Sequence, residues 1–187
     1  MNMTRILAIS DTHLKGDLPE KLASLAKDAD LVLHAGDFVT IEVYEAFDRL
    51  GNFEAVSGNS DSVELRKLLP ERKVIEVEGV RLGLVHRATR SSDLAAVEFL
   101  AREMEVDALI FGHIHRPYVE RVPQLLICPG SPTEPRMSPP TVAEIEVNYG
   151  EIKGRILPLG KPICKYIKYA ESLSRQKTSD YRREPIR

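Results

Sequence analysis

The stretch Arg5-Ile6-Leu7-Ala8-Ile9-Ser10-Asp11-Thr12-His13 decides how this chain folds. Its apolar run has the length of one buried strand, and the polar residues that follow predict a loop. The same arrangement returns at residues 31–37 (LVLHAGD) and 53–59 (FEAVSGN). Apolar residues with helical spacing lie between these runs, at residues 18–26 and 41–50. Strands that alternate with helices predict an α/β domain with parallel strand pairs.

The second half of the chain predicts shorter strands and more turns. Residues 73–77 and 81–85 flank Glu78-Gly79-Val80 and predict a hairpin that ends at His86. A helix over residues 94–103, capped within Ser91-Ser92-Asp93, precedes a buried strand at 108–111 and Gly112-His113-Ile114-His115. Further short strands are expected at residues 118–122, 125–128, 141–147 and 151–157. Parallel units first and antiparallel strands later indicate two stacked sheets with helices outside.

Length and composition fit one globular domain. The chain has 187 residues, of which 43% are hydrophobic and 29% charged, and its net charge is −2. Such a chain can bury a substantial core, and a near-neutral surface gives no general indication of nucleic-acid or membrane binding. The apolar run near the start is too short for a signal peptide, and no run approaches a transmembrane helix. We therefore expect a cytoplasmic protein in which Cys128 and Cys164 stay reduced.

The compact domain is expected to span residues 1–160, followed by a basic C-terminal extension over residues 161–187. This extension holds eight Lys or Arg against three Asp or Glu. Apolar residues recur with helical spacing from Ile163 to Leu173, which fits an amphipathic helix docked on its own domain or on a neighbour. A solvated terminus fits the pattern better beyond about residue 175.

Side chains that bind metals gather in the loops after the predicted strands. They are two Asp, one Asn and four of the five histidines of the chain: Asp11, His13, Asp37, Asn59, His86, His113 and His115. Because ligand sites in α/β domains lie where strands end, we expect these side chains to converge. Mixed nitrogen and oxygen donors suit divalent transition metals better than Mg²⁺ or Ca²⁺. The pattern predicts a two-metal hydrolytic site, with phosphate esters as the natural substrates.

The same residues carry a resemblance to a known family. Asp11-x-His13, Gly36-Asp37, Gly58-Asn59-x-Asp61, His86 and Gly112-His113-x-His115 resemble, in this order, the motifs of the calcineurin-like metallophosphoesterases. The small size and Cys128-Pro129-Gly130-Ser131 are similar to the compact bacterial and archaeal phosphodiesterases of that superfamily. The resemblance spans roughly residues 4–157. It implies a four-layer α/β/β/α sandwich of two mixed sheets with outer helices, and a phosphodiesterase in which a metal-bridging hydroxide attacks phosphorus in line with the leaving group.

The resemblance also implies two divalent transition metal ions (Mn, Fe, Ni or Zn) and the residues that hold them. One ion would be held by Asp11, His13, Asp37 and His115, and the other by Asp37, Asn59, His86 and His113. Asp37 would then bridge the ions, and the expected catalytic residues are Asp37, Asn59 and His86; no organic cofactor is expected.

Two arginines are candidates to contact the substrate phosphate. Arg87 follows a proposed ligand and could clamp a phosphate bidentately, or it could point to solvent. Arg136 aligns with an arginine common in the small family members, and a structural salt bridge is the alternative there.

Three further positions carry specific expectations. Ser60 stands where larger phosphatases of the superfamily carry a histidine that can protonate the leaving oxygen. Serine is a poor acid near neutral pH, so we expect faster hydrolysis of phosphodiesters with acidic, aryl leaving groups. His34 is expected to be a core imidazole, or one that supports a ligand, rather than a ligand itself. Asp61 is expected to cap a helix that begins near Ser62.

The alternative function is a non-catalytic protein-binding scaffold of the same fold, like the retromer subunit that resembles it. A scaffold has no need for all seven ligand-type side chains, and this chain has every one of them. The expected partners are a small phosphodiester and, by family resemblance, further copies of the chain. Membrane binding is not expected, and nucleic acid is a possible substrate that nothing specific in the sequence supports.

Overall fold

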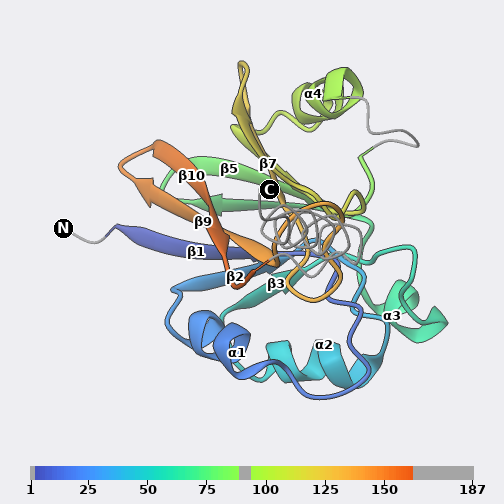
Figure 1. Ribbon diagram of the computed structural model, residues 1–187. Coiled ribbons are helices and arrows are strands. Elements are labelled where there is room, and N and C mark those ends of the chain that lie inside the picture. The colour runs from blue at the N-terminus through green and yellow to red at the C-terminus, as the bar shows by residue number, and fades with distance from the viewer. Residues whose placement is uncertain (1–2, 89–93, 162–187) are drawn as a thin grey trace, which may run out of the picture.

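Two five-stranded sheets make up most of what the computed structural model describes, residues 3–88 and 94–161 (Figure 1). The first sheet contains β1 (Thr4–Ile9), β2 (Leu31–His34), β3 (Phe53–Ala55), β9 (Thr141–Asn148) and β10 (Glu151–Pro158). The second sheet contains β4 (Arg72–Val77), β5 (Val80–Val85), β6 (Ala108–Phe111), β7 (Pro117–Arg121) and β8 (Leu125–Pro129). The helices of the described residues are α1 (Glu20–Lys27), α2 (Ile41–Asp48), α3 (Val63–Leu68) and α4 (Leu94–Glu103).

Both sheets are mixed. In the first, of order β10-β9-β1-β2-β3, β1 and β3 each pair with β2 in parallel, and β9 pairs with β1 and β10 in antiparallel fashion. In the second, of order β4-β5-β6-β8-β7, the central strands β5, β6 and β8 are parallel and the edge strands β4 and β7 are antiparallel. The expectation that the later strands would be antiparallel is therefore wrong for the centre of this sheet. There α4 lies in the crossover between β5 and β6 that a parallel pair requires.

Alternation along the strands produces the layers. Ile6 and Ala8 of β1 are buried in the cluster between the two sheets, whereas Leu7 and Ile9 are buried against the α1 and α2 side. That outer cluster includes Leu22 of α1, and a third cluster packs α4 on the far face of the second sheet. Figure 1 shows α1 and α2 below one sheet and α4 beyond the other. The predicted α/β/β/α order is confirmed.

The turns and helix ends follow local chemistry. The two predicted hairpins are present, and their turn residues Glu78-Gly79 and Tyr149-Gly150 have φ of 48° and 80°, and of 48° and 82°. Positive φ at both central residues characterises the type I′ turn that matches strand twist. The first helix begins at Glu20 rather than residue 18, because Pro19 precedes it at ψ 134° as the N-cap.

Some predictions fall on residues outside the described ranges. They are the cap within residues 91–93, the helical spacing from Ile163 to Leu173, Cys164, and nearly all of the extension 161–187. Within the described residues, Cys128 is a buried free thiol whose pKa is raised by that burial. None of the helices in these ranges is both long enough and apolar enough to cross a membrane.

Candidate metal centre

The loops that carry the predicted ligands meet at one rim of the sandwich. Loops after β1 and β2 are joined by bonds from the Asp11 N–H to the Gly36 carbonyl and from the His13 N–H to the Asp37 carbonyl, both 3.0 Å long. The second sheet is joined to the first by the His86 ring, whose Nδ1 lies 2.7 Å from the carbonyl oxygen of Ala35. Residues far apart in the sequence are thus held side by side by hydrogen bonds to backbone carbonyls.

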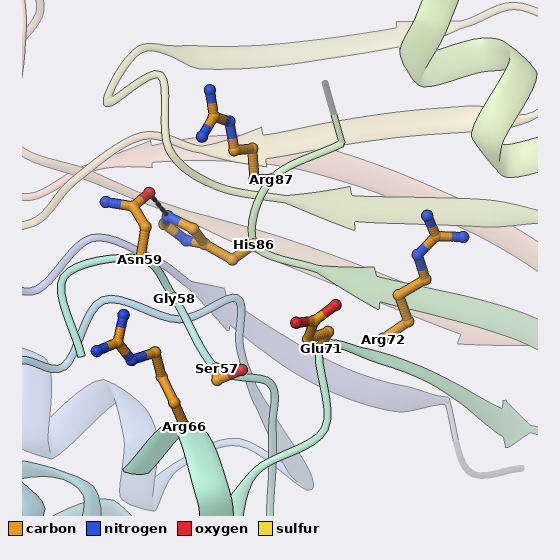
Figure 2. Close-up of a pocket in the computed structure, with 8 residues that line it drawn as sticks. All are labelled: Ser57, Gly58, Asn59, Arg66, Glu71, Arg72, His86 and Arg87. Carbon is orange, nitrogen blue, oxygen red and sulfur yellow. Dashed lines mark hydrogen bonds between the residues drawn. The ribbon is translucent and has the colours of Figure 1, made fainter. Parts of the chain in front are cut away.

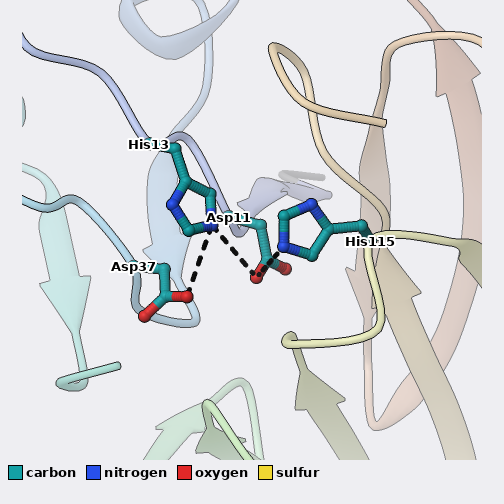
Figure 3. A group of neighbouring side chains, drawn as sticks. All are labelled: Asp11, His13, Asp37 and His115. Carbon is teal, nitrogen blue, oxygen red and sulfur yellow. Dashed lines mark ion pairs between the residues drawn. The ribbon is translucent and has the colours of Figure 1, made fainter. Parts of the chain in front are cut away.

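Four of the seven predicted ligands form a tight cluster (Figure 3). The ligand atoms of Asp11, His13, Asp37 and His115 all lie within 4.8 Å of one another. His13 Nε2 is 3.3 Å from Asp37 Oδ2, and His115 Nε2 is 3.3 Å from Asp11 Oδ1. Both carboxylates and His115 are buried, and His13 is half-buried. This group matches the set expected for the first ion.

The remaining three residues lie next to this cluster. His86 Nε2 is 3.4 Å from Asp37 Oδ2 and 3.0 Å from Asn59 Oδ1. The backbone N–H of His113 donates to the Asp11 carboxylate, and the His113 ring centroid is 5.4 Å from that of His86. All seven predicted residues are therefore brought to one site, and the Asp37 carboxylate faces both groups.

The hydrogen bonds of the histidines show that the cluster suits a cation. Nδ1 of His115 and Nδ1 of His86 each lie 2.7 Å from a carbonyl oxygen, of Glu134 and of Ala35. A carbonyl only accepts, so the Nδ1 atoms carry the protons, and in the neutral form of each ring Nε2 presents a lone pair to a carboxylate oxygen. His86 Nε2 also lies 3.0 Å from Asn59 Oδ1, another acceptor, as expected of two ligands of one cation. His13 Nε2 is buried without any hydrogen-bond partner. Lone pairs that face one another across 3.3 to 3.4 Å are compatible when a cation lies between them.

The backbone at the cluster is strained. Left-handed φ values, which cost a non-glycine residue about 1–2 kcal/mol, occur at five of the seven predicted ligands. They are Asp11 (54°), His13 (43°), Asp37 (64°), His113 (74°) and His115 (55°). The loops hold the side chains in place at the expense of backbone energy, as ligand-binding loops commonly do.

Two glycines of the motifs are required by close approach. A Cβ atom on Gly58 would lie 2.2 Å from Asp37 Oδ1 and 2.3 Å from the Asp37 nitrogen. A Cβ atom on Gly112 would lie 3.0 Å from Asp11 Oδ2. The Gly-Asn and Gly-His pairs therefore bring backbone against the two carboxylates where no side chain fits.

Ser60 and Asp61 support Asp37 in ways that the sequence did not indicate. The backbone N–H and the hydroxyl of Ser60 donate to the two oxygens of Asp37, at 2.7 and 2.9 Å. Asp61 accepts from the N–H groups of Gly58, Val39 and Asp37, at 2.6, 2.8 and 3.2 Å. The prediction that Asp61 caps a helix is wrong.

The cap of α3 is the neighbouring Ser62, whose hydroxyl accepts from the Leu65 N–H at 3.2 Å. Asp61 instead joins the loop after β2 to the loop after β3.

His34 is a core residue, as expected. Its Nδ1 accepts from the Gly36 N–H at 3.1 Å, so Nε2 carries the proton toward Thr12 Oγ1, 3.2 Å away. The Thr12 hydroxyl in turn donates to the Asp37 carbonyl at 3.3 Å. Complete burial lowers the pKa of His34 well below 6.5, and the charges of His86 and His13 lower it further. The His34 ring is thus a neutral group that links Gly36 and Thr12 behind the cluster.

Burial also shifts the pKa values of two of the candidate ligands. It raises the pKa of the Asp11 carboxyl, although the charges of His86 and His115 oppose this shift. Burial lowers the pKa of His113, and the charges of His86 and Arg87 act in the same direction. Neutral imidazole, the form that binds metal, is therefore favoured at His113.

The two candidate phosphate-binding arginines occupy different positions. Arg87 lines a cavity of about 370 Å³ that also includes Asn59 and His86 (Figure 2). Arg136 has an exposed side chain, and its backbone N–H donates to the His115 carbonyl at 3.1 Å. No carboxylate in residues 3–88 or 94–161 forms an ion pair with Arg136. The structural salt bridge, which was the alternative role expected for Arg136, is therefore not formed within this part of the chain.

The chain resembles known proteins over most of its length. A family model described as the calcineurin-like phosphoesterase superfamily domain matches residues 4–150. A probable metallophosphoesterase of Methanothermobacter thermautotrophicus is 31% identical over 169 residues, which cover 86% of this chain and 96% of that protein.

Two solved structures show the same fold. An archaeal phosphodiesterase superposes with a TM-score of 0.61 at 23% identity, over 82% of this chain and 100% of the other. Entamoeba histolytica Vps29 complexed with Zn²⁺ superposes with a TM-score of 0.68 at 22% identity, over 84% of this chain and 100% of the other. Together with the family match and the candidate metal cluster, the comparisons show that this chain belongs to the calcineurin-like phosphoesterase superfamily.

Proposed function

We propose that this protein is a phosphodiesterase that works with two divalent transition metal ions, Mn, Fe, Ni or Zn. The observation that carries the proposal is the position of Asp37. Its Oδ2 lies 3.3 Å from Nε2 of His13 and 3.4 Å from Nε2 of His86, so one carboxylate faces both groups of candidate ligands. A carboxylate shared in this way is what a two-metal site requires.

Each group would hold one ion. Asp11, His13, Asp37 and His115 form one set, and Asp37, Asn59, His86 and His113 form the other. When bound, such ions supply the activation of water for in-line attack on phosphorus and the neutralisation of charge on the phosphoryl oxygens.

The chain's own residues contribute orientation. The carbonyls of Glu134 and Ala35 fix the rings of His115 and His86, each with its Nε2 toward the centre. The N–H and hydroxyl of Ser60 hold both oxygens of Asp37. Ligands that are locked before substrate arrives lower the cost of reaching the reactive geometry. Arg87 and Arg136 remain the proposed contacts to substrate phosphate.

The position of Ser60 bears on the leaving group. Its hydroxyl donates to Asp37, and a serine is in any case a weak acid near neutral pH. The proposed enzyme therefore favours phosphodiesters whose leaving groups depart without protonation.

The test is a substrate panel on purified protein with Mn²⁺ added, after elemental analysis of the bound metals. We expect hydrolysis of bis(p-nitrophenyl) phosphate at least about 100-fold faster than that of dialkyl phosphodiesters. Asp37→Asn should lower turnover by at least about 100-fold and lower the metal content, while circular dichroism stays that of the wild type. Equal rates on aryl and alkyl diesters would contradict the leaving-group argument, and two bound ions with full turnover in Asp37→Asn would contradict the role of Asp37.

A protein-binding scaffold is the second candidate, because Vps29 proteins are among the structural neighbours. The complete ligand set and its locked histidines favour catalysis. Absence of turnover on every phosphoester with Mn²⁺ would favour the scaffold.

A further inference from the structure

A cavity of about 370 Å³ opens directly beside the candidate metal centre (Figure 2). Asn59 and His86 line this cavity, and both belong to the candidate metal centre. His86 Nε2 is 3.4 Å from Asp37 Oδ2 and 3.0 Å from Asn59 Oδ1. A substrate held at the proposed centre therefore has this cavity directly beside it. The volume is within the range of sites for nucleotide-sized ligands.

The lining of this cavity is positively charged. Arg66 comes from α3, Arg72 from the start of β4 and Arg87 from the loop after β5, so three separate segments supply guanidinium groups. Glu71 is the one carboxylate that the described part of the chain contributes to the lining. Figure 2 shows the Arg66 side chain extending toward Asn59. Arginines gathered from separate elements around one space create a field that favours an anion.

The three arginines differ in how far they are neutralised. Arg72 Nη1 pairs with Glu103 Oε1 at 3.1 Å, which ties it to α4. Arg66 has no ion pair within residues 3–88 and 94–161. Arg87 follows His86 and lies at the end of the cavity nearest the proposed metal centre. Arg66 is thus the position at which a further anion gains most.

The remaining lining indicates which anion fits. Ser57, Gly58 and Asn59 add polar groups and backbone, and among residues 3–88 and 94–161 no Phe, Tyr or Trp side chain lines the cavity. A nucleobase gains most of its binding energy from aromatic stacking, which this lining does not offer. Phosphate gains most from the fork of a guanidinium, which forms two parallel hydrogen bonds to its oxygens.

We propose that this cavity binds a second phosphate of the substrate, so that the preferred substrates are phosphodiesters that carry a further phosphate group. Arg66 is the residue that binds it, whereas Arg87, next to His86, stays a contact of the reacting phosphate. The inference rests on the proposed function, because it places the reacting phosphodiester at Asn59 and His86.

A matched pair of probes tests the inference. Thymidine 5′-(p-nitrophenyl phosphate) and the same compound with a 3′-phosphate share the reacting diester and the leaving group, and differ by one phosphate. With the Mn²⁺-loaded wild-type protein, we expect kcat/KM for the 3′-phosphorylated probe to be roughly 10- to 100-fold higher, mainly through KM. Arg66→Ala should reduce this ratio toward one.

Lys67→Ala is the matched control. Lys67 is exposed on the same helix and is next to Arg66 in sequence, but it does not line the cavity. This variant removes the same charge from α3 and should keep the wild-type ratio of the two probes. A loss of the ratio in Lys67→Ala as large as in Arg66→Ala would mean that general surface charge, rather than the cavity, selects the substrate.

A binding measurement separates the two proposals. Isothermal titration calorimetry should show that thymidine 3′,5′-bisphosphate binds at least about 10-fold more tightly than thymidine 5′-monophosphate, and that Arg66→Ala abolishes the difference. Equal kcat/KM for the two probes would overturn the second phosphate site and leave the phosphodiesterase standing. No turnover of either probe, together with the binding preference, would overturn the phosphodiesterase and leave the anion site standing. Equal binding of the two nucleotides would overturn the anion site.

Discussion

Asp37 shows what the environment of one residue adds to its chemical type. The sequence predicted this residue at a metal centre because a carboxylate follows a buried strand. It gave no indication that Ser60 would donate two hydrogen bonds to it, or that Ala35 and Glu134 would orient His86 and His115. Two of those contacts are made by backbone carbonyls, which every residue possesses. Ligand types can therefore be predicted from residues, whereas the contacts that fix their direction cannot.

His34 carries a prediction about pH. Its folded-state pKa lies well below the usual 6.5, so the folded protein keeps it neutral while the unfolded chain takes up a proton. The contribution of neutral His34 to the free energy of unfolding is therefore present in full above pH 6.5, and it is lost as the pH falls below that value. We expect the free energy of unfolding to fall by about 1.4 kcal/mol per pH unit below that point. Urea unfolding between pH 7 and pH 5, with a chelator present, measures it.

The control for this prediction is His34→Asn. The raised pKa of Asp11 acts in the opposite direction, because a folded acid that holds its proton loses stability as the pH rises. Asp11 is present in both proteins, so the difference between their pH slopes isolates His34. Equal slopes in wild type and variant would show that His34 is not the buried neutral group described here.

At the level of elements, the predictions succeeded where a pattern is local. Residues 31–35 were expected as a buried strand and β2 spans Leu31–His34; Glu78-Gly79 was expected in a turn and has the required positive φ values. The neighbours of each strand could not be predicted, because a run such as ALIF at β6 is buried on both faces and fits either parallel or antiparallel pairing. The parallel pairing of β6 with β8 was missed for this reason.

The loop between β3 and α3 carries the second prediction at this level. Asp61 accepts three backbone N–H groups from two loops, while Ser62 caps α3. Asp61→Asn would set an amide N–H₂ against those donors, and we expect a loss of about 2–3 kcal/mol in the free energy of unfolding. Ser62→Ala should cost only about 1 kcal/mol. Chemical denaturation of both variants measures the two losses, and a larger loss for Ser62→Ala would return the main role in this loop to helix capping.

At the level of the whole molecule, the site exists because two sheets end at the same rim. Asp11, Asp37 and Asn59 follow strands of the first sheet, and His86 and His115 follow strands of the second. Strand patterns place each residue at a loop, but only the stacking of the sheets sets Asp37 and His86 within 3.4 Å. That stacking depends on the shape of the apolar cluster between the sheets, which residue types alone do not specify.

Because the proposed ligands come from both sheets, bound metal should stabilise the entire sandwich. A metal that binds only the folded chain adds about 4 kcal/mol to the free energy of unfolding when its concentration is about 1,000 times its dissociation constant. We expect the melting temperature to rise with added Mn²⁺ or Zn²⁺ and to fall with a chelator, as measured by differential scanning calorimetry. Asp37→Asn should lose most of the rise, because its carboxylate faces ligands of both groups. A melting temperature that does not respond to metal in the wild type would mean that the loops of the two sheets are not joined through a cation.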